Sequence, residues 1–222
     1  MNSTILAHES KTRLLDAALH VIRAKGYSAT RVEDICEAAS LTKGSFFHHF
    51  KSKEDLAVAA ADYWGARTSA LFAASAYNDV AALPDPVDRI LAYIDLRKAL
   101  IQGDLPDFTC LLGTMVQEVY DTHPQIRDAC SHSITSHAAT LVPDIQAAMK
   151  QHAIKPDIQT GFTAESLALY TQATVQGAFI LAKAKHNAAI AIDCINHLHR
   201  YVELLFNQPS STQEKAPCLT TQ

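Results

Sequence analysis

The first fifty residues hold three short segments with helical periodicity, and this tight succession constrains the fold more than any other feature of the chain. The first segment places an apolar stripe on one face of a helix, made of Leu14, Leu15, Ala18, Leu19 and Ile22. This helix is predicted to end near Lys25 and Gly26, because glycine readily adopts the left-handed conformation that closes helices.

A second and a third helix are predicted directly after it. Thr30 is expected to cap the second helix, whose first turn carries the acidic residues that a helix dipole favours. Its apolar positions are Val32, Ile35, Cys36 and Ala39. A four-residue connection over 40–43 leads to the third helix, GSFFHHF. Two helices joined by so short a turn and braced by a preceding helix form a helix-turn-helix.

The rest of the chain is predicted to be helical as well. One long helix spans about 52–74, and a helix capped by Asp85 follows it and ends before Gly103. Asp107 is expected to open a helix through FTCLLGTMVQEVY. Another begins at Pro124, and Pro143 must kink or divide it because proline lacks an amide N–H.

Two alanine-rich helices over roughly 163–185 and 188–206 complete the prediction, and the polar tail over 209–222 is expected to be disordered. The expected fold class is therefore all-α. It has about nine helices, or ten if the proline at 143 separates two, with a three-helix N-terminal head on a larger helical body.

Composition excludes several classes of protein. The chain of 222 residues is 48% apolar, too much for a disordered protein, and its 7 glycines and 8 prolines are few for the turns of a β-sandwich. No apolar stretch approaches membrane-spanning length, and the first residues lack a secretory signal pattern. The five cysteines show no CxxC spacing and are expected to be free thiols in a cytoplasmic protein with no membrane contact.

Charge is distributed unevenly along the chain. The net charge of −4 speaks against nucleic-acid binding when taken alone. Residues 1–54, however, hold eight basic and six acidic residues, whereas the remainder holds eleven and seventeen. A mildly basic head on an acidic body is therefore predicted.

The segment GYSATRVEDICEAASLTKGSFFHHFKSKEDL resembles the N-terminal helix-turn-helix signature of the TetR family of bacterial transcription regulators. The resemblance covers about residues 10–58 and rests on Gly26, Tyr27, Thr30, Ile35, Ala39, Gly44, His49, Phe50, Lys53 and Leu56. It implies a DNA-binding domain over 1–52 and a ligand-binding and dimerisation domain over 53–208. Most relatives are repressors that a small molecule releases from a palindromic DNA operator, so the same is expected here.

The third helix is predicted to carry the DNA contacts. Phe46 and Phe50 share one face and should pack inward, which leaves Ser45, Phe47 and His48 facing outward. The family commonly has tyrosine at the position of Phe47, so one phosphate hydrogen bond is lost here. The expected DNA-binding residues are Thr30, Arg31, Thr42, Lys43, Gly44, Ser45, Phe47, His48, His49, Lys51 and Lys53. The alternative is that Phe47 and His48 merely cover the fourth helix.

In the body, the resemblance implies a ligand pocket among the middle helices and an intersubunit four-helix bundle formed by the last two helices. The candidate pocket residues are Tyr93, Leu96, Leu100, Phe108, Cys110, Leu111, Leu112, Met115 and Phe179. The candidate dimer residues are Ala173, Gly177, Ala178, Leu198, Tyr201, Val202 and Leu205. Any of the pocket residues could equally be plain core, and the apolar stripe of the last helix could cover the subunit's own core.

Cys110 stands out because it is predicted to lie in the first turn of a helix, where unpaired N–H groups favour a thiolate. The segment TCLLGTMVQEV resembles the start of the same helix in relatives that respond to electrophiles, with Thr109 in place of glycine. A cysteine-based electrophile or redox sensor is thus one hypothesis. A small buried core residue is the other, and the more common one for cysteine.

Catalytic and metal-binding motifs are missing from the sequence. The histidine pairs 132/137 and 197/199 do not converge on a helix, so neither a metal nor another cofactor is expected. A small helical enzyme would need convergent titratable groups that the spacing does not provide. A helical adaptor that binds another protein through its acidic body remains an alternative to the regulator.

Overall fold

The computed structural model describes residues 2–154 and 162–206, and these ranges contain eleven α-helices, one short 3₁₀ helix and no strand. The predicted all-α class is thereby confirmed. The tail over 209–222 lies outside the described residues. The helices are α1 (Asn2–Lys25), α2 (Val32–Ala38), α3 (Lys43–His49), α4 (Lys53–Ala73), η1 (Ala76–Asn78), α5 (Pro86–Ala99), α6 (Leu105–Phe108), α7 (Leu111–Val119), α8 (Pro124–Ala139), α9 (Val142–Gln151), α10 (Ala164–Lys185) and α11 (Ala188–Phe206).

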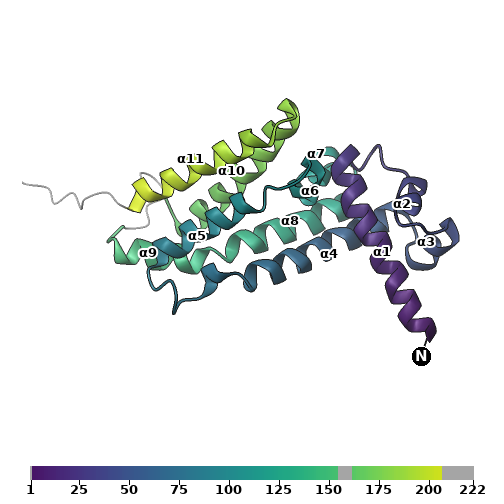
Figure 1. Cartoon of the computed structure of the whole chain (residues 1–222), viewed down its shortest axis with the longest axis horizontal. Coiled ribbons are helices and arrows are strands. Elements are labelled where there is room, and N and C mark those ends of the chain that lie inside the picture. Colours follow the sequence, from purple (N-terminus) through teal and green to yellow (C-terminus); the bar gives the residue numbers. More distant parts are fainter. Residues whose placement is uncertain (1, 155–161, 207–222) are drawn as a thin grey trace, which may run out of the picture.

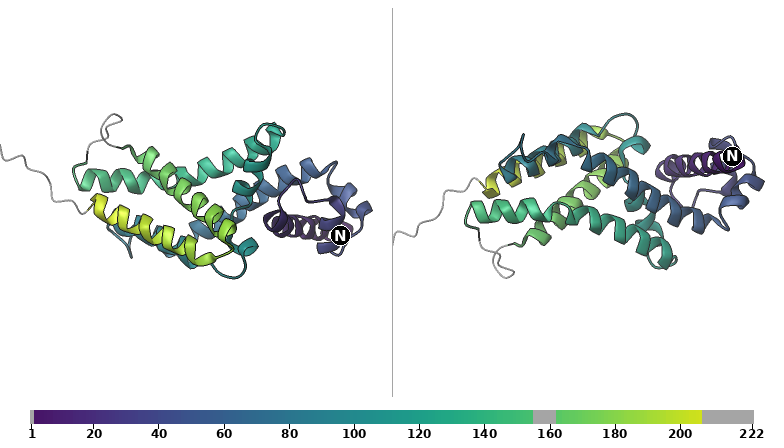
Figure 2. Two further views of the ribbon diagram at one scale, coloured as in Figure 1. Left: turned by 90° about the horizontal axis from the view of Figure 1, so that it is seen from above. Right: turned by 90° about the horizontal axis from the view of Figure 1, so that it is seen from below.

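The molecule is elongated, with α1, α2 and α3 forming a head at one end (Figure 1). The long helix α4 leaves this head and runs through the body beside α8 (Figures 1 and 2). The helices α10 and α11 form an antiparallel pair on one side of the body, and α11 ends far from the head (Figure 1). The predicted helix-turn-helix head contacts the body mainly through α4, α6 and α7, which pack against α1.

Local sequence signals set most helix ends. Gly26 closes α1 with a φ of 87°, the left-handed conformation that glycine tolerates. Thr42, Ser52 and Asp85 cap α3, α4 and α5, each accepting a hydrogen bond from a backbone N–H in the first turn. The predicted Thr30 cap is wrong: Arg31 is the N-cap of α2, because Asp34 folds back onto the Arg31 backbone N–H and side chain.

Two of the nine expected helices are each divided, which accounts for the count of eleven. Pro143 starts α9 in its first turn, where no amide N–H is needed, and so separates α9 from α8. The expected helix from Asp107 splits into α6 and α7, because Thr109 and Cys110 take extended backbone conformations between them. Cys110 is therefore the N-cap of α7 and does not lie inside a first turn.

Two apolar clusters hold the described chain together. One fills the body between α5, α9, α10 and α11. The other fills the head around Leu14, Ile35 and Phe46, and α7 and α8 complete it with Met115 and Ile126, among other residues. Because the head cluster continues into the body, a shift of α7 cannot leave the head undisturbed.

Candidate DNA-binding face and ligand cavity

The third helix, α3, presents the outward face that its periodicity predicts. Phe46 and Phe50 are 0% and 3% exposed and pack inside the head, whereas the Phe47 ring is 57% exposed. Gly44 and His48 are exposed beside it, and Ser45 is half-buried. A ring and two polar side chains on one free helix face can contact base edges, methyl groups and sugars in a DNA groove.

Basic and polar groups surround this face. Lys43 is exposed and forms an ion pair with Glu33, whereas Lys51 is exposed with no ion pair among the described residues. Arg31 pairs with Asp34 at 3.2 Å on the adjoining turn. The hydroxyl of Thr42 accepts from the Ser45 backbone N–H, so this side chain serves the helix start. His49 is held by a hydrogen bond of 2.7 Å between its Nε2 and the Ser10 hydroxyl.

Two of the predicted DNA contacts have their side chains engaged inside the protein. Thr30 is 1% exposed, and its hydroxyl donates to the Gly26 carbonyl at 2.6 Å. The Lys53 ammonium donates to the carbonyls of Tyr27 and Thr30 at 3.0 and 2.9 Å and lies 4.2 Å from the centre of the Tyr27 ring. Burial lowers the pKa of Lys53, and Glu118 opposes that effect. These side chains hold the loop after α1 in place.

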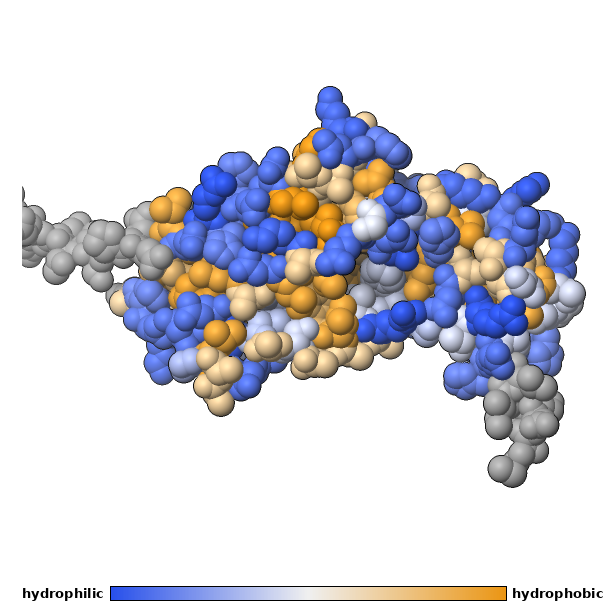
Figure 3. Space-filling view, viewed as in Figure 1, coloured by the Kyte–Doolittle hydropathy of each residue, from blue (hydrophilic) through white to orange (hydrophobic). Residues whose placement is uncertain are grey.

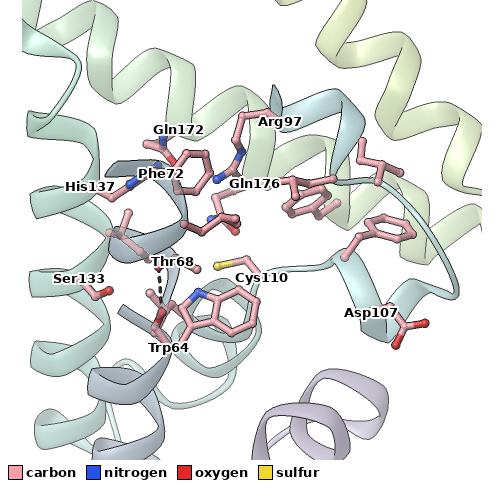
Figure 4. Close-up of a pocket in the computed structure, with 17 residues that line it drawn as sticks. Trp64, Thr68, Phe72, Arg97, Asp107, Cys110, Ser133, His137, Gln172 and Gln176 are labelled. Atoms are coloured by element: carbon pink, nitrogen blue, oxygen red, sulfur yellow. Dashed lines mark hydrogen bonds between the residues drawn. The ribbon is translucent and has the colours of Figure 1, made fainter. Parts of the chain in front are cut away.

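A cavity of about 190 Å³ lies in the body, directly behind the head (Figure 4). Its walls come from α4, α5, α6, α8, α10 and the start of α7. Of the predicted pocket residues, Leu100, Phe108, Cys110, Leu112 and Phe179 line it. Residues that sequence reasoning missed contribute most of its polar lining, namely Thr68, Arg97, Asp107, Ser133, His137, Gln172 and Gln176.

Four predicted pocket residues do not line this cavity. Leu111 and Met115 are fully buried in the head cluster, to which α7 contributes them. Leu96 packs against the body cluster from its edge. Tyr93 is fully buried behind the cavity wall, where it supports two side chains that do face the cavity.

These supporting contacts form a short hydrogen-bonded chain. The Gln172 amide donates to the Tyr93 hydroxyl at 2.8 Å, and that hydroxyl is therefore free to donate to His137 Nε2 at 2.9 Å. Burial, with a smaller contribution from Arg97, lowers the pKa of His137 to about 4. His137 is thus neutral at pH 7, and its Nε2 accepts the hydrogen bond from the Tyr93 hydroxyl.

Cys110 projects into the middle of the cavity between Trp64 and Gln176 (Figure 4). It is half-buried and also borders a second cavity of about 220 Å³ between α7 and α10. Cys110 lies within electrostatic range of two cations, Arg23 from α1 and Lys183 from α10. The sequence hid both, because they are 87 and 73 positions away along the chain.

The helix α7 connects the cavity to the head. Its start borders the cavity at Cys110 and Leu112, and Glu118, two turns later, accepts hydrogen bonds from the backbone N–H groups of Tyr27 and Ser28 at 3.0 and 2.8 Å. A Cβ atom at Gly26 would clash with the Glu118 carboxylate, so glycine favours this close approach as well as the positive φ. One rigid helix therefore touches both sites.

The predicted dimer residues divide between the surface and the core. Leu198 and Val202 are 2% and 0% exposed inside the subunit, because they point from α11 into the body cluster. Ala178 is likewise buried. Ala173 and Tyr201 are exposed, Gly177 faces open space, and Leu205 is half-buried.

The exposed apolar side chains of α10 and α11 were not all expected. They are Leu169, Tyr170, Ile180, Leu181, Tyr201 and Leu204, of which Leu204 is 68% exposed. Apolar residues also gather at the surface over α10 in the space-filling view (Figure 3). Their periodicity was hidden in the sequence, because α10 carries apolar residues on every side.

Within the described residues, no group of three or more potential ligands comes together to hold a metal ion, and none of the helices is long and apolar enough to span a membrane. The protein has an exposed face on α3, basic residues around that face and a cavity that α7 connects to the head. These features are typical of helix-turn-helix transcription regulators. The sequence profile of the tetR family of bacterial regulatory proteins matches residues 14–60, and that of the tetracyclin repressor-like C-terminal domain matches residues 86–197. The second match alone spans half of the chain, and the chain belongs to the TetR family.

Curated relatives match this chain over short stretches. The uncharacterized HTH-type transcriptional regulator YerO of Bacillus subtilis is 35% identical over 57 residues, which cover 26% of this chain and 20% of YerO. The transcriptional regulator AcuR of Cereibacter sphaeroides is 44% identical over 54 residues, which cover 24% of this chain and 23% of AcuR. The chain thus aligns with about a fifth of the length of these relatives.

Solved structures match nearly the whole fold. A TetR transcriptional regulator from Chloroflexus aurantiacus has a TM-score of 0.72 and 28% identity, over 89% of this chain and 96% of the other. A TetR-family regulator from Agrobacterium tumefaciens has a TM-score of 0.74 and 22% identity, over 88% and 98% of the two chains, and this likeness shows the fold alone. Regulators of this family bind DNA operators and small-molecule effectors, generally as dimers, and are generally not enzymes.

Proposed function

We propose that this protein is a dimeric, non-enzymatic repressor that leaves a palindromic operator when a small molecule enters the cavity behind its head. The observation that carries the proposal is the position of α7, which borders the cavity at Cys110 and holds the loop after α1 through Glu118. DNA binding belongs to residues 1–52, and ligand binding and dimerisation to 53–208. Such a protein acts in the cytoplasm, where its operator lies.

The DNA contacts in this proposal come from the exposed part of the head. They are Arg31, Thr42, Lys43, Gly44, Ser45, Phe47, His48, His49 and Lys51. Gly44 lets the backbone of α3 approach the groove, since no side chain intervenes. The lysines neutralise phosphates, and Ser45, Phe47 and His48 contact base edges.

Release follows from the geometry of a dimer. Two recognition helices must lie one helical turn of DNA apart, about 34–36 Å, or a multiple of it. A ligand that presses on α4 and on the start of α7 shifts the head relative to the body, because α4 and α7 both belong to the head cluster. A shift of a few ångströms at each subunit puts the two helices out of register with the two half-sites.

The dimer face of this proposal is the exposed apolar surface of α10 and α11. It includes Ala173, Gly177, Tyr201 and Leu205 from the predicted set, together with Leu204 and the other exposed apolar side chains. An open strip around Gly177 permits close helix approach. Pairing these faces buries apolar surface that would otherwise contact water.

A second mode of release is favoured by Cys110. Its sulfur lies in the cavity, at a helix N-cap, within electrostatic range of Arg23 and Lys183. An α,β-unsaturated carbonyl compound in the cavity would accept the thiolate at its β-carbon and a proton at its α-carbon. A quinone or enal should then release wild-type protein from DNA while Cys110→Ser stays bound, and equal release of both would exclude this cysteine as the sensor.

The test of the main proposal joins ligand and DNA binding. A compound library is screened by thermal shift, and cavity binders are those that stabilise wild type but not Ser133→Phe, which fills the cavity. Each should weaken binding to duplex DNA from upstream of the protein's own gene, measured by fluorescence anisotropy. Unchanged DNA affinity would contradict ligand release. A failure to bind any DNA would contradict the regulator and favour the adaptor.

A further inference from the structure

The cavity contains a cation with no counter-ion, and this feature bears on the ligand. Arg97 lines the cavity from α5, and its Cζ lies 5.4 Å from the centre of the Phe72 ring. No carboxylate of the described residues forms an ion pair with it. The half-buried guanidinium interacts with the Tyr93 hydroxyl, and it keeps a positive charge and part of its five N–H donors for a ligand in the cavity.

A second arginine on the same helix, Arg89, has its charge paired and its N–H donors hydrogen-bonded. Arg89 is 7% exposed, donates twice to Asp144 at 2.8 and 2.7 Å and reaches the Leu83 carbonyl at 2.7 Å. A buried charge without such partners is costly. Arg97 lies two turns further along α5. It faces the cavity, whereas Arg89 faces the Asp144 carboxylate.

The remaining charged group of the cavity lining does not neutralise Arg97. The Asp107 carboxylate accepts the Asp104 backbone N–H at 2.9 Å and acts on Arg23 of α1. It lies at the opposite side of the cavity from Arg97 and points away from the cavity (Figure 4). His137 is neutral at pH 7, so it adds no second charge beside the arginine.

Gln172 extends the polar end of the cavity. It lies with Phe72 and His137 at the same end as Arg97 (Figure 4), is 5% exposed and is fixed by its hydrogen bond to Tyr93. Its carboxamide has a second N–H to donate. A planar guanidinium beside an amide N–H matches the two oxygens of a carboxylate.

Aromatic side chains cover much of the rest of the cavity, which is of limited size. Trp64, Phe108 and Phe179 provide aromatic surface there, and the rings of Phe108 and Phe179 are 5.9 Å apart. The volume of about 190 Å³ exceeds the roughly 150 Å³ that holds a benzene molecule in an engineered apolar cavity. One ring, or a short chain of similar bulk, fits together with a small polar group.

We propose that the effector is a small monocarboxylate with an apolar body of about one ring, bound through its carboxylate by Arg97 and Gln172. This inference rests on the proposed ligand-responsive function and names the chemistry of its ligand. The apolar body lies against Trp64, Phe108 and Phe179, next to Cys110. The Arg97 guanidinium neutralises the negative charge of this ligand in the cavity and repels a cationic ligand.

Calorimetry on the full chain tests this with matched probes. Benzoate, phenylacetate and hexanoate are each compared with the corresponding neutral amide, and benzoate also with benzylamine. Wild type should bind at least one acid tenfold or more tightly than its amide and should not bind benzylamine. Arg97→Met should lose that preference while keeping amide affinity, and Arg67→Met, which removes an exposed arginine outside the cavity, should behave as wild type.

Two results would overturn the inference: no acid preferred over its amide by wild type, or the acid preference kept by Arg97→Met. If Arg97→Met does not fold, Arg97→Lys keeps the charge and should retain part of the preference. Binding of ligand-free protein to DNA is measured in parallel. DNA binding without acid preference contradicts only this inference, whereas acid preference without DNA binding contradicts only the proposed function.

Discussion

At the scale of single residues, the two lysines at the end of the helix-turn-helix have different roles although they are two positions apart. The Lys51 side chain is exposed, and the Lys53 ammonium is bound to the carbonyls of Tyr27 and Thr30. From the sequence, both lysines are predicted to contact DNA phosphates, because the prediction rests only on their charge and spacing. The structure distinguishes the two lysines, because only the Lys53 ammonium donates hydrogen bonds to carbonyls of the head.

Replacing these lysines should therefore produce opposite phenotypes. Lys51→Ala should weaken binding to all duplex DNA about equally and reduce the salt dependence by roughly one contact, with unchanged stability. Lys53→Ala should lower the free energy of unfolding by roughly 1–3 kcal/mol, because two buried carbonyls lose a charged donor. Urea unfolding and fluorescence anisotropy at several salt concentrations distinguish the two, and equal stability of both variants would contradict this assignment.

His137 gives the fold a pH dependence of predictable sign. Burial lowers its pKa from 6.5 to about 4, so between these values the unfolded chain binds a proton that the folded protein does not. Its contribution to stability is complete above pH 6.5 and is lost as the pH falls towards 4, by an amount on the order of 3 kcal/mol. Denaturant unfolding between pH 7 and pH 4 should show a shallower decline in His137→Gln, and parallel curves would exclude this histidine as a cause.

At the scale of elements, α7 differs most from the helix predicted from the sequence, and it borders both the cavity and the head. The expected helix through 107–120 breaks at Thr109, whose hydroxyl donates to the Leu105 carbonyl and ends α6 after one turn. The break brings Cys110 to an N-cap at the cavity and leaves Glu118 facing the loop after α1. A continuous helix would have had neither contact.

The contact of Glu118 should measure how firmly the body holds the head. Glu118→Ala leaves the N–H groups of Tyr27 and Ser28 without their acceptor, which should cost roughly 1–3 kcal/mol of stability. Hydrogen exchange at these two amides should accelerate, and Glu118→Gln, which keeps one acceptor oxygen, should lie between. Tyr120→Ala, on the exposed end of the same helix, serves as the control. Unaltered exchange at both amides in Glu118→Ala would show that the carboxylate does not hold the loop.

Periodicity could predict the elements but not the partners across the cavity. The inward Phe46 and Phe50 and the caps at Ser52 and Asp85 follow from residues a few positions apart. The pairing of Gln172 with Tyr93 joins residues 79 positions apart, and no local pattern announces it. Twelve of the seventeen residues that line the cavity could not be predicted for that reason, and seven of these twelve are polar residues that come from five different helices.

At the scale of the whole molecule, the two kinds of apolar residue on α11 predict how the protein assembles. Val202 is fully buried in its own subunit, whereas Leu204 is 68% exposed on the face that we assign to the partner. One helix serves the core with one side and, in our proposal, the second subunit with another.

Glutamate substitutions separate these roles. Leu204→Glu should give a folded monomer, since it places a carboxylate in the dimer face without touching the subunit core. Val202→Glu should unfold the subunit, since its carboxylate would be buried without a partner. Light scattering with circular dichroism reads both outcomes. A stable dimer of Leu204→Glu at micromolar concentration would move the interface elsewhere.

The central claim, that the head is a sequence-specific DNA reader, is tested most directly by selection from a random duplex library with the purified full chain. The protein should enrich a palindromic site, bind it with an affinity that falls steeply as salt rises, and lose preference for it in Ser45→Ala or His48→Ala. Phe47→Ala should weaken binding to the site while leaving the fold intact, because the ring is exposed. A selection that enriches no sequence, from protein that is folded and dimeric, would contradict the account.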